Sequence, residues 1–143
     1  MPKTKILIAK PIPSQSDPDF TNIDAIGEAF GVRIPHRGYL RPSGAFVPCR
    51  NLLLWWPNET SDKWENTISE NGKTVTSRSR EDAFDIRPIQ IGADTGRLTA
   101  IFFKPKNGAY GYRFVGVFKT NLEASRTQHR HVYVQVADAI ELP

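Results

Sequence analysis

The residues whose types and spacing could do chemistry begin with a group of arginines in the first half of the chain. Arg33, Arg37, Arg41 and Arg50 fall within 18 positions that contain no Asp or Glu. The planar guanidinium suits bidentate recognition of phosphates and base edges, and it also stacks on rings. This stretch therefore predicts contacts with a phosphorylated ligand or a nucleic acid. An ordinary solvated loop is the alternative.

Tryptophans form the second group. Trp55, Trp56 and Trp64 all lie within ten residues, just after a loop from Pro35 to Gly44 that mixes Arg, His, Tyr and Gly. On a strand, Trp55 and Trp56 would point to opposite faces, so one can fill the core while the other lines a cleft. Aromatic faces stack on bases at about 1–3 kcal/mol each. Core packing remains the alternative for any one of them, because a small barrel needs large side chains.

A metal or cofactor site is harder to assemble. His129 and His131 are two residues apart and could share a metal ion on one face of a strand, but no third ligand is spaced for it. Pairing of these histidines, or a phosphate contact at the start of a strand, is the favoured interpretation. The sequence contains no phosphate-binding loop, dinucleotide-binding glycine pattern or nucleophile elbow. We therefore predict no cofactor and no metal.

Two other arrangements could suggest bond-breaking chemistry. Cys49 and a distant histidine could form a nucleophilic pair, although a small buried side chain before a strand is the simpler interpretation. Asp62, Glu65 and Glu70 suggest a nuclease carboxylate cluster, but the lysine of an Asp…Glu-x-Lys pattern is missing after Glu65. The sequence thus predicts a binding protein rather than an enzyme.

The composition indicates what kind of fold must position these residues. The chain has 143 residues, of which 39% are hydrophobic and 24% charged, and its formal net charge is +4. These values are typical of one globular domain, which we expect to span residues 1–143. No apolar run approaches the roughly 18–20 residues that cross a bilayer. The single cysteine is consistent with a cytoplasmic protein.

Helical spacing occurs once, near the front of the chain. Ile23, Ile26 and Phe30 recur at helical intervals, and Gly31 supplies a stop. Asp19 or Thr21 would cap the start. We expect one helix of about ten residues within this segment.

The rest of the chain has the pattern of β-strands. A short strand is expected at Lys5–Lys10, and the others at Leu52–Trp56, Trp64–Glu70, Lys73–Ser79, Leu98–Lys104, Tyr112–Thr120 and His131–Val136. Asn71-Gly72 is a hairpin signal, and Asp94-Thr-Gly96 is interpreted as a turn. The five or six strands expected after the front helix, together with that helix, predict an α+β, mostly β fold, a mixed and mostly antiparallel barrel or rolled sheet.

Several short motifs resemble PUA-like modules of the SRA and EVE kind. The resemblance is closest to those at the front of modification-dependent HNH and related restriction endonucleases. It rests on Gly38-Tyr39-Leu40-Arg41-Pro42-Ser43, Ser61-Asp62-Lys63-Trp64-Glu65-Asn66 and Tyr112-Arg113-Phe114-Val115-Gly116-Val117-Phe118, within residues 20–142. It implies a PUA-like pseudo-barrel whose concave, aromatic-lined pocket accepts a flipped or exposed base.

The resemblance also implies roles for individual residues. The base-binding candidates, as stacking or edge-reading groups, are Trp55, Trp56, Trp64, Asn66, Asp62, Tyr39 and Tyr112. The phosphate-binding candidates are Arg37, Arg41, Arg50 and His36. The sequence contains no nuclease domain up to Pro143, so a restriction-like role would need a domain excised from this sequence or an effector nuclease on a separate chain; a different purpose for the fold is the alternative.

The leading functional hypothesis is a non-catalytic module that binds nucleic acid, most plausibly DNA with a modified base. A second is a stand-alone protein, such as a phage-encoded one, that sequesters a nucleotide signal. A third is a protein–protein interaction module in which Trp, Tyr and Arg anchor an interface. A hydrolase ranks last, because no nucleophile–base pair can be named.

Overall fold

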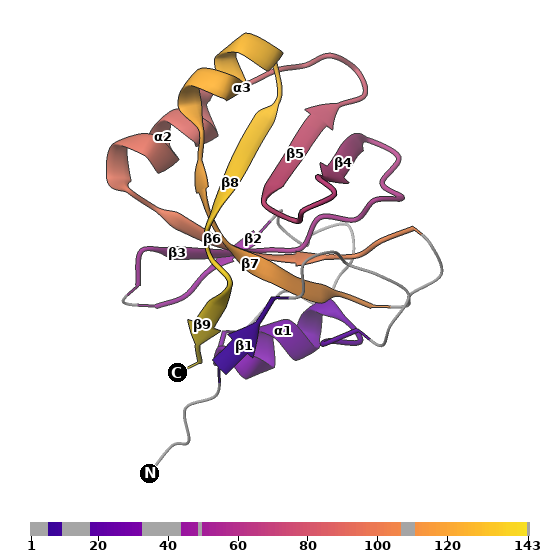
Figure 1. Ribbon diagram of the computed structural model, residues 1–143, viewed down its shortest axis with the longest axis vertical. Coiled ribbons are helices and arrows are strands. Elements are labelled where there is room, and N and C mark those ends of the chain that lie inside the picture. Colours follow the sequence, from indigo (N-terminus) through magenta and orange to yellow (C-terminus); the bar gives the residue numbers. More distant parts are fainter. Residues whose placement is uncertain (1–5, 10–17, 33–43, 49, 107–110, 143) are drawn as a thin grey trace.

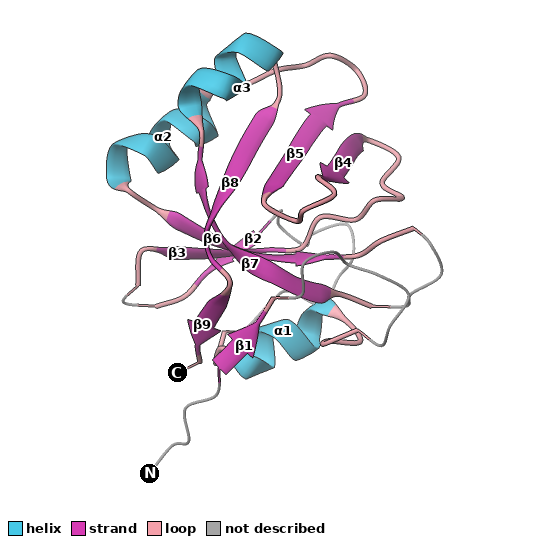
Figure 2. Cartoon of the chain, viewed as in Figure 1, coloured by secondary structure: helices cyan, strands magenta, loops and turns pink. Residues whose placement is uncertain are grey.

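The computed structural model describes residues 6–9, 18–32, 44–48, 50–106 and 111–142 (Figures 1 and 2). The helices of this part are α1 (Ile23–Ala29), α2 (Arg87–Thr95) and α3 (Leu122–Gln128). The strands are β1 (Ile6–Ile8), β2 (Gly44–Phe46), β3 (Leu52–Trp55), β4 (Trp64–Ile68), β5 (Thr74–Ser79), β6 (Leu98–Phe103), β7 (Arg113–Thr120), β8 (His131–Ala137) and β9 (Ala139–Glu141).

One mixed sheet organises the described chain. Its seven strands lie in the order β2-β3-β6-β7-β8-β5-β4, and β1 pairs with β9 in a separate two-stranded sheet. The β3–β6 pair is parallel, whereas the other strand pairs are antiparallel. Because β2 and β4 are both edge strands, this sheet is open. The mostly β, mixed α+β prediction is confirmed, but the sheet of the described residues does not close into a barrel.

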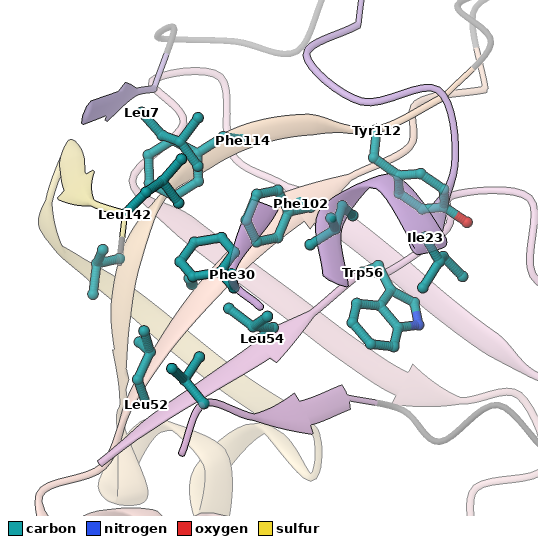
Figure 3. Packing of buried hydrophobic residues seen from close by; sticks show 14 residues of the cluster. Leu7, Ile23, Phe30, Leu52, Leu54, Trp56, Phe102, Tyr112, Phe114 and Leu142 are labelled. Carbon is teal, nitrogen blue, oxygen red and sulfur yellow. The ribbon is translucent and has the colours of Figure 1, made fainter. Parts of the chain in front are cut away.

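The sheet separates two hydrophobic cores. The first lies on one face of β3, β6 and β7 and includes Leu54, Phe102 and Phe114. Helix α1 and the β1–β9 sheet cover this face, where Trp56 and Tyr112 lie among the packed side chains (Figures 1 and 3). Each of these elements contributes one apolar face, so the cluster is closed on both sides.

The second core lies on the opposite face and is shared with β5 and β8. Its buried members are Val75, Ile89, Ile101, Phe103, Val115, Phe118 and Tyr133. Trp55 packs against it from β3, and Leu122 does so from α3. Figure 1 shows α2 and α3 together at one end of the sheet, beside β8. Alternating residues of β6 thus pack into the two cores, one on each face of the sheet. This explains why almost every residue of β6 is buried.

A β-bulge in β7 changes which side chains share a face. The register of β7 shifts against β6 between Ile101 and Phe102, and Gly116 adopts a φ of 134°. As a result, Phe114 and Val117 face the first core, while Val115 and Phe118 face the second. Strict alternation along β7 would put Phe114 and Phe118 on one face, whereas the bulge places them on opposite faces. Simple alternation fails where an extra residue enters a strand.

The predicted front helix is confirmed, with a different cap. The Asn22 side chain accepts a hydrogen bond from the backbone N–H of Ala25 at 2.8 Å, so Asn22 and neither Asp19 nor Thr21 is the N-cap. Gly31 follows the helix with a φ of 65°, which fits its predicted role as a stop. Asp19 instead accepts a hydrogen bond from the backbone N–H of Phe114.

The prediction of a single helix is wrong, because the structure contains α2 and α3 as well. Sequence periodicity did not reveal these two helices, since neither has a wide apolar stripe. Helix α2 buries only Ile89 and Gly92, and its segment begins with Arg87-Pro88. Helix α3 buries only Ser125. The Asp94-Thr-Gly96 segment is the end of α2 rather than a free turn, with Gly96 in the left-handed conformation.

The strand predictions hold well where local signals are strong. Trp64–Ile68 and Thr74–Ser79 form the predicted hairpin, and Gly72 in its turn has a φ of 72°. The strands at Leu52, Leu98, Arg113 and His131 are also present. Strands β2 and β9, each three residues long, were not predicted.

No helix in the described part of the chain is long and apolar enough to cross a membrane.

Candidate functional site

The register of β4, β5 and β8 brings polar and aromatic side chains onto one face of the sheet. Asn66 is paired with Ser77, and Ser77 with His131; next to them Trp64 is paired with Ser79. Residues that are directly opposite across strands point to the same face. Val75 and Tyr133, paired two residues further along, belong to the second core. Together these strands present what we call the inner face, apolar at one end and polar at the other.

Trp64 is the most accessible aromatic residue of the inner face. It is the first residue of edge strand β4 and retains 38% of its surface exposed. Its backbone N–H donates to Ser61 Oγ at 3.2 Å, which holds the start of the strand. One neighbour is His131, whose ring stacks on the indole at 6.2 Å between centroids and 29° between planes. A partly exposed indole of this kind can stack on a planar ligand.

Asn66 lies deeper and is held in one orientation. It is 6% exposed, and its Nδ2 donates to the backbone oxygen of Asn58 at 3.0 Å. Ser77 Oγ donates to Asn66 Oδ1 at 2.6 Å. A backbone carbonyl can only accept, so the Asn58 contact fixes which end of the amide carries the nitrogen. One amide hydrogen and one lone pair of Oδ1 stay outside these two bonds, an arrangement suited to reading a base edge.

Trp55 and Tyr133 form the apolar end of the inner face. Their rings lie 5.0 Å apart at an interplanar angle of 42°. Burial raises the pKa of the Tyr133 phenol to about 12, and the charge of Arg97 opposes this shift in part. The phenol is therefore neutral at physiological pH, and this end of the face presents ring surfaces rather than charge.

Basic side chains flank the end of the hairpin where Trp64 lies. Arg80 donates from its backbone N–H to the oxygen of Lys63 at 3.0 Å, and both side chains are exposed. Arg80 Nε also donates to Ser61 O at 3.1 Å. Arg78, by contrast, contacts Glu65 and Asp82 at 3.4 Å each. Lys63 and Arg80 are therefore exposed cations at the end of the hairpin where β4 begins.

The segment after β5 closes the site at the β8 side. His131 Nε2 lies 2.8 Å from the backbone oxygen of Asp85. The Asp85 carboxylate accepts hydrogen bonds from the Arg87 side chain and backbone, which lower the pKa of this carboxyl below its usual value. The Asp85 backbone thus contacts His131, while its carboxylate contacts Arg87.

The predicted binding residues separate into several places. Trp55, Trp64 and Asn66 lie at the inner face. Trp56 and Tyr112 instead lie in the first core, where they are 7% and 8% exposed. The structure thus places the two adjacent tryptophans on opposite faces, as the sequence predicts. Of the seven base-binding candidates, Trp64 and Asn66 lie together on β4, and Trp55 contacts Tyr133 at the apolar end of the inner face.

Other candidates lie away from this group. Asp62 is exposed in the turn before β4. Arg50 Nη1 donates to the backbone oxygen of Glu141 at 3.3 Å and lines a groove of about 510 Å³ beside Leu52, Leu98 and the C-terminal strand. The candidates outside the described residues are His36, Arg37, Tyr39 and Arg41, together with Arg33 and Cys49.

Sequence reasoning missed Ser77, Phe84 and Tyr133, and for His131 it considered a metal, a pairing with His129 or a phosphate contact but no contact with Trp64. The hairpin turn at Asn71-Gly72 could have given the Asn66–Ser77 pairing, because a two-residue turn sets the register of both strands. The contact of β8 with β5 joins residues more than fifty positions apart, and no local signal shows it. Within the described ranges, no three His, Cys, Asp or Glu side chains are grouped to hold a metal ion.

In the part of the chain that the structure describes, an open mixed sheet of seven strands, a small second sheet and three helices define a mostly β α+β domain. The model of the "SET and RING associated domain" (SRA) family matches residues 10–142, so the chain belongs to this family. Its SRA-type resemblance is thereby confirmed.

A solved structure shares this fold. It is described as "The 5-Hydroxymethylcytosine-Specific Restriction Enzyme AbaSI", and it superposes with a TM-score of 0.63 at 20% sequence identity. The match covers 85% of this chain and 39% of the AbaSI chain, so the present chain spans well under half the length of that enzyme. No curated protein matches the sequence.

Proposed function

We propose that this chain is a DNA-binding module that recognises a modified or flipped base on its inner face. The single observation that carries the proposal is that Trp64 and Asn66 lie side by side on the same face of one strand. A half-exposed indole and a buried amide of fixed orientation lie two residues apart on one face of β4. Membership of the SRA family supports a base as the ligand. The module supplies recognition and no bond-breaking chemistry.

The two side chains have different tasks in this proposal. Trp64 stacks on the ring of the extracted base, which offsets part of the few kcal/mol that extraction costs. Asn66 reads the base edge through the amide hydrogen and the lone pair that Asn58 and Ser77 leave available. Trp55 and Tyr133 close the apolar end of the site.

Phosphate contacts come from cations around this face. Lys63 and Arg80 are exposed at the end of the hairpin where β4 begins, which supports the proposal that they contact the DNA backbone. Arg37, Arg41 and His36, in the acid-free stretch outside the described residues, are proposed to extend this contact. Phosphate contacts release counterions, so affinity should fall steeply as salt rises.

The test is a titration of two short duplexes that differ at one base. One contains a single 5-hydroxymethylcytosine, the base named for the enzyme of shared fold, and the other contains cytosine there. We expect the protein to bind both in a salt-dependent manner and to prefer the modified duplex. Trp64→Ala should abolish most of this preference, whereas Lys63→Gln should weaken binding to both duplexes by a similar factor.

Matched outcomes decide between the functional classes. No binding to either duplex at low salt contradicts the proposal. Tight binding of a free nucleotide without any affinity for duplexes would instead favour nucleotide sequestration. A preference that survives both Trp64→Ala and Asn66→Ala would show that the base is read elsewhere.

A further inference from the structure

His131 lies between Trp64 and a second aromatic ring, Phe84. The imidazole stacks on the indole of Trp64, and its other neighbour is Phe84, whose ring centroid lies 5.9 Å away at an angle of 55°. Phe84 is half-buried and stacks in turn on His129, at 5.5 Å and 4°. Rings from β4, β8 and the segment between β5 and α2 therefore form a continuous row that ends at Trp64.

A hydrogen bond fixes the His131 ring within this row. Its Nε2 lies 2.8 Å from the backbone oxygen of Asp85. Because that oxygen can only accept, Nε2 is the protonated nitrogen, which sets both the tautomer and the plane of the ring. The ring is thus held by a backbone contact at Nε2 and lies against two aromatic rings, the stacked Trp64 and the tilted Phe84.

Trp64 needs such support because of its place in the sheet. It starts β4, which is an edge strand, so strand pairing fixes it from β5 only. More than a third of the residue is exposed, and its backbone is held by Ser61 and by the hairpin register. The indole orientation therefore depends on side-chain contacts, and His131 supplies the stacked one.

We propose that His131 is a positioning residue that holds the Trp64 indole in the orientation that stacks on a base. This inference rests on the proposed function for the identity of the ligand, but its effect on Trp64 exists in the free protein. A side chain that is ordered before binding loses less rotamer entropy on binding, so the support of His131 appears as affinity for the extracted base.

The test compares two substitutions, one that keeps only the ring of the histidine and one that keeps only its hydrogen-bond donor. His131→Phe keeps a flat ring against Trp64 and removes the donor to Asp85. His131→Gln keeps an amide donor at a similar reach and removes the ring. His129→Gln is the matched control, because His129 contacts Phe84 and has no recorded ring contact with Trp64. Thermal unfolding of each variant separates a loss of positioning from a loss of fold.

Two measurements are made on each variant. The first is the ratio of affinities for the 5-hydroxymethylcytosine duplex and the cytosine duplex. Aromatic pairs contribute about 0.5–1.5 kcal/mol beyond burial, so His131→Gln should lower this ratio by about 2- to 13-fold. The second is the NMR order parameter of the Trp64 indole N–H in the free protein. It should fall in His131→Gln and stay near the wild-type value in His131→Phe and His129→Gln.

Each outcome has a distinct meaning. An unchanged Trp64 order parameter in His131→Gln overturns the inference, whatever happens to DNA binding. Equal losses in the Phe and Gln variants also overturn it, because the hydrogen bond and not the ring would then be responsible. If His131→Gln loosens Trp64 but the wild-type protein binds the two duplexes equally, the positioning role stands and the proposed function fails.

Discussion

Trp56 and Trp64 lie on opposite sides of the same sheet and show how one residue type serves two purposes. Trp56 is 7% exposed and packs with Ile23 and Tyr112 beneath helix α1 (Figure 3). Trp64 is 38% exposed at the edge of the sheet and contacts a histidine instead of an apolar cluster. The face that contains Trp56 is closed by α1 and the β1–β9 sheet, whereas the end that contains Trp64 combines buried polar groups with accessible ring surface.

Under the proposed function, this difference means that one face of the sheet mainly stabilises the fold while the polar end of the other face recognises the ligand. The first core has hydrophobic partners on both sides, and its described members are apolar or aromatic. The inner face of β4, β5 and β8 buries Asn66 and Ser77 and satisfies them with each other. Buried polar groups are costly unless they are hydrogen-bonded, so such a network marks the face where specificity would reside.

The largest expected effect tests the structural half of this comparison. Trp56→Ala should lower the free energy of unfolding by about 3–5 kcal/mol, because it leaves a large cavity in the first core. Denaturant titration followed by far-UV circular dichroism measures this loss. A change below about 1 kcal/mol would show that Trp56 is not a core residue of the kind described.

The second effect tests the binding half. Trp64→Ala should weaken binding to the 5-hydroxymethylcytosine duplex by about 5- to 150-fold, since base stacking contributes about 1–3 kcal/mol. Its unfolding free energy should change much less than that of Trp56→Ala, because Trp64 is half-exposed. The comparison is contradicted if Trp64→Ala lowers the free energy of unfolding as much as Trp56→Ala does, while the variant, kept folded at low temperature, still prefers the modified duplex.

A third prediction concerns hydroxyl groups on the two faces of β5. Ser77→Ala leaves the buried Oδ1 of Asn66 without its donor and should destabilise the fold by about 1–3 kcal/mol. Thr76→Val is the control, because Thr76 points to the other face, where its hydroxyl contacts Thr67 at the surface. Chemical denaturation should show a clear loss for the first variant and a small one for the second. Equal effects would contradict the distinction between the faces.

The smallest effect is a pH dependence due to Tyr133. Its pKa in the folded protein is raised to about 12, so unfolding becomes easier as pH rises from 10 towards 12, where only the unfolded chain ionises readily. At pH 11 the free energy of unfolding should be lower by about 1.4 kcal/mol, which corresponds to one pKa unit. The stability contributed by the neutral phenol is fully present below pH 10.

The Tyr133→Phe variant isolates this contribution. Its unfolding free energy should decline less than that of the wild type between pH 10 and 11, as followed by denaturant titration at each pH. Parallel curves for the two proteins would show that Tyr133 is accessible to solvent and that the apolar end of the inner face is open.

Much of the β framework could be predicted because its signals are local. The Asn71-Gly72 turn sets the β4–β5 register, and alternation in Leu52–Trp55 places Trp55 and Trp56 on opposite faces. Helices α2 and α3 could not be predicted this way, because each buries one or two residues and has no apolar stripe. The bulge at Gly116 similarly defeats alternation, since its position depends on the neighbouring strands.

The candidate site divides in the same way. Trp64 was selected because the three tryptophans are close together in the sequence, whereas Asn66 was selected through the family resemblance of Ser61-Asp62-Lys63-Trp64-Glu65-Asn66. Ser77, Tyr133 and His131 join them through strand pairings that link distant parts of the sequence. Trp56 and Tyr112 were grouped with them through the family resemblance, yet the sheet places both among apolar partners on its other side.

The most direct test of the account follows the three tryptophan indole N–H resonances while the 5-hydroxymethylcytosine duplex is added to the full chain. Single Trp→Phe variants assign the three signals. The account predicts that the Trp64 resonance shifts most and saturates with binding, while the Trp56 resonance stays unchanged in the first core. A shift of the Trp56 resonance without any change at Trp64 would contradict recognition on the inner face.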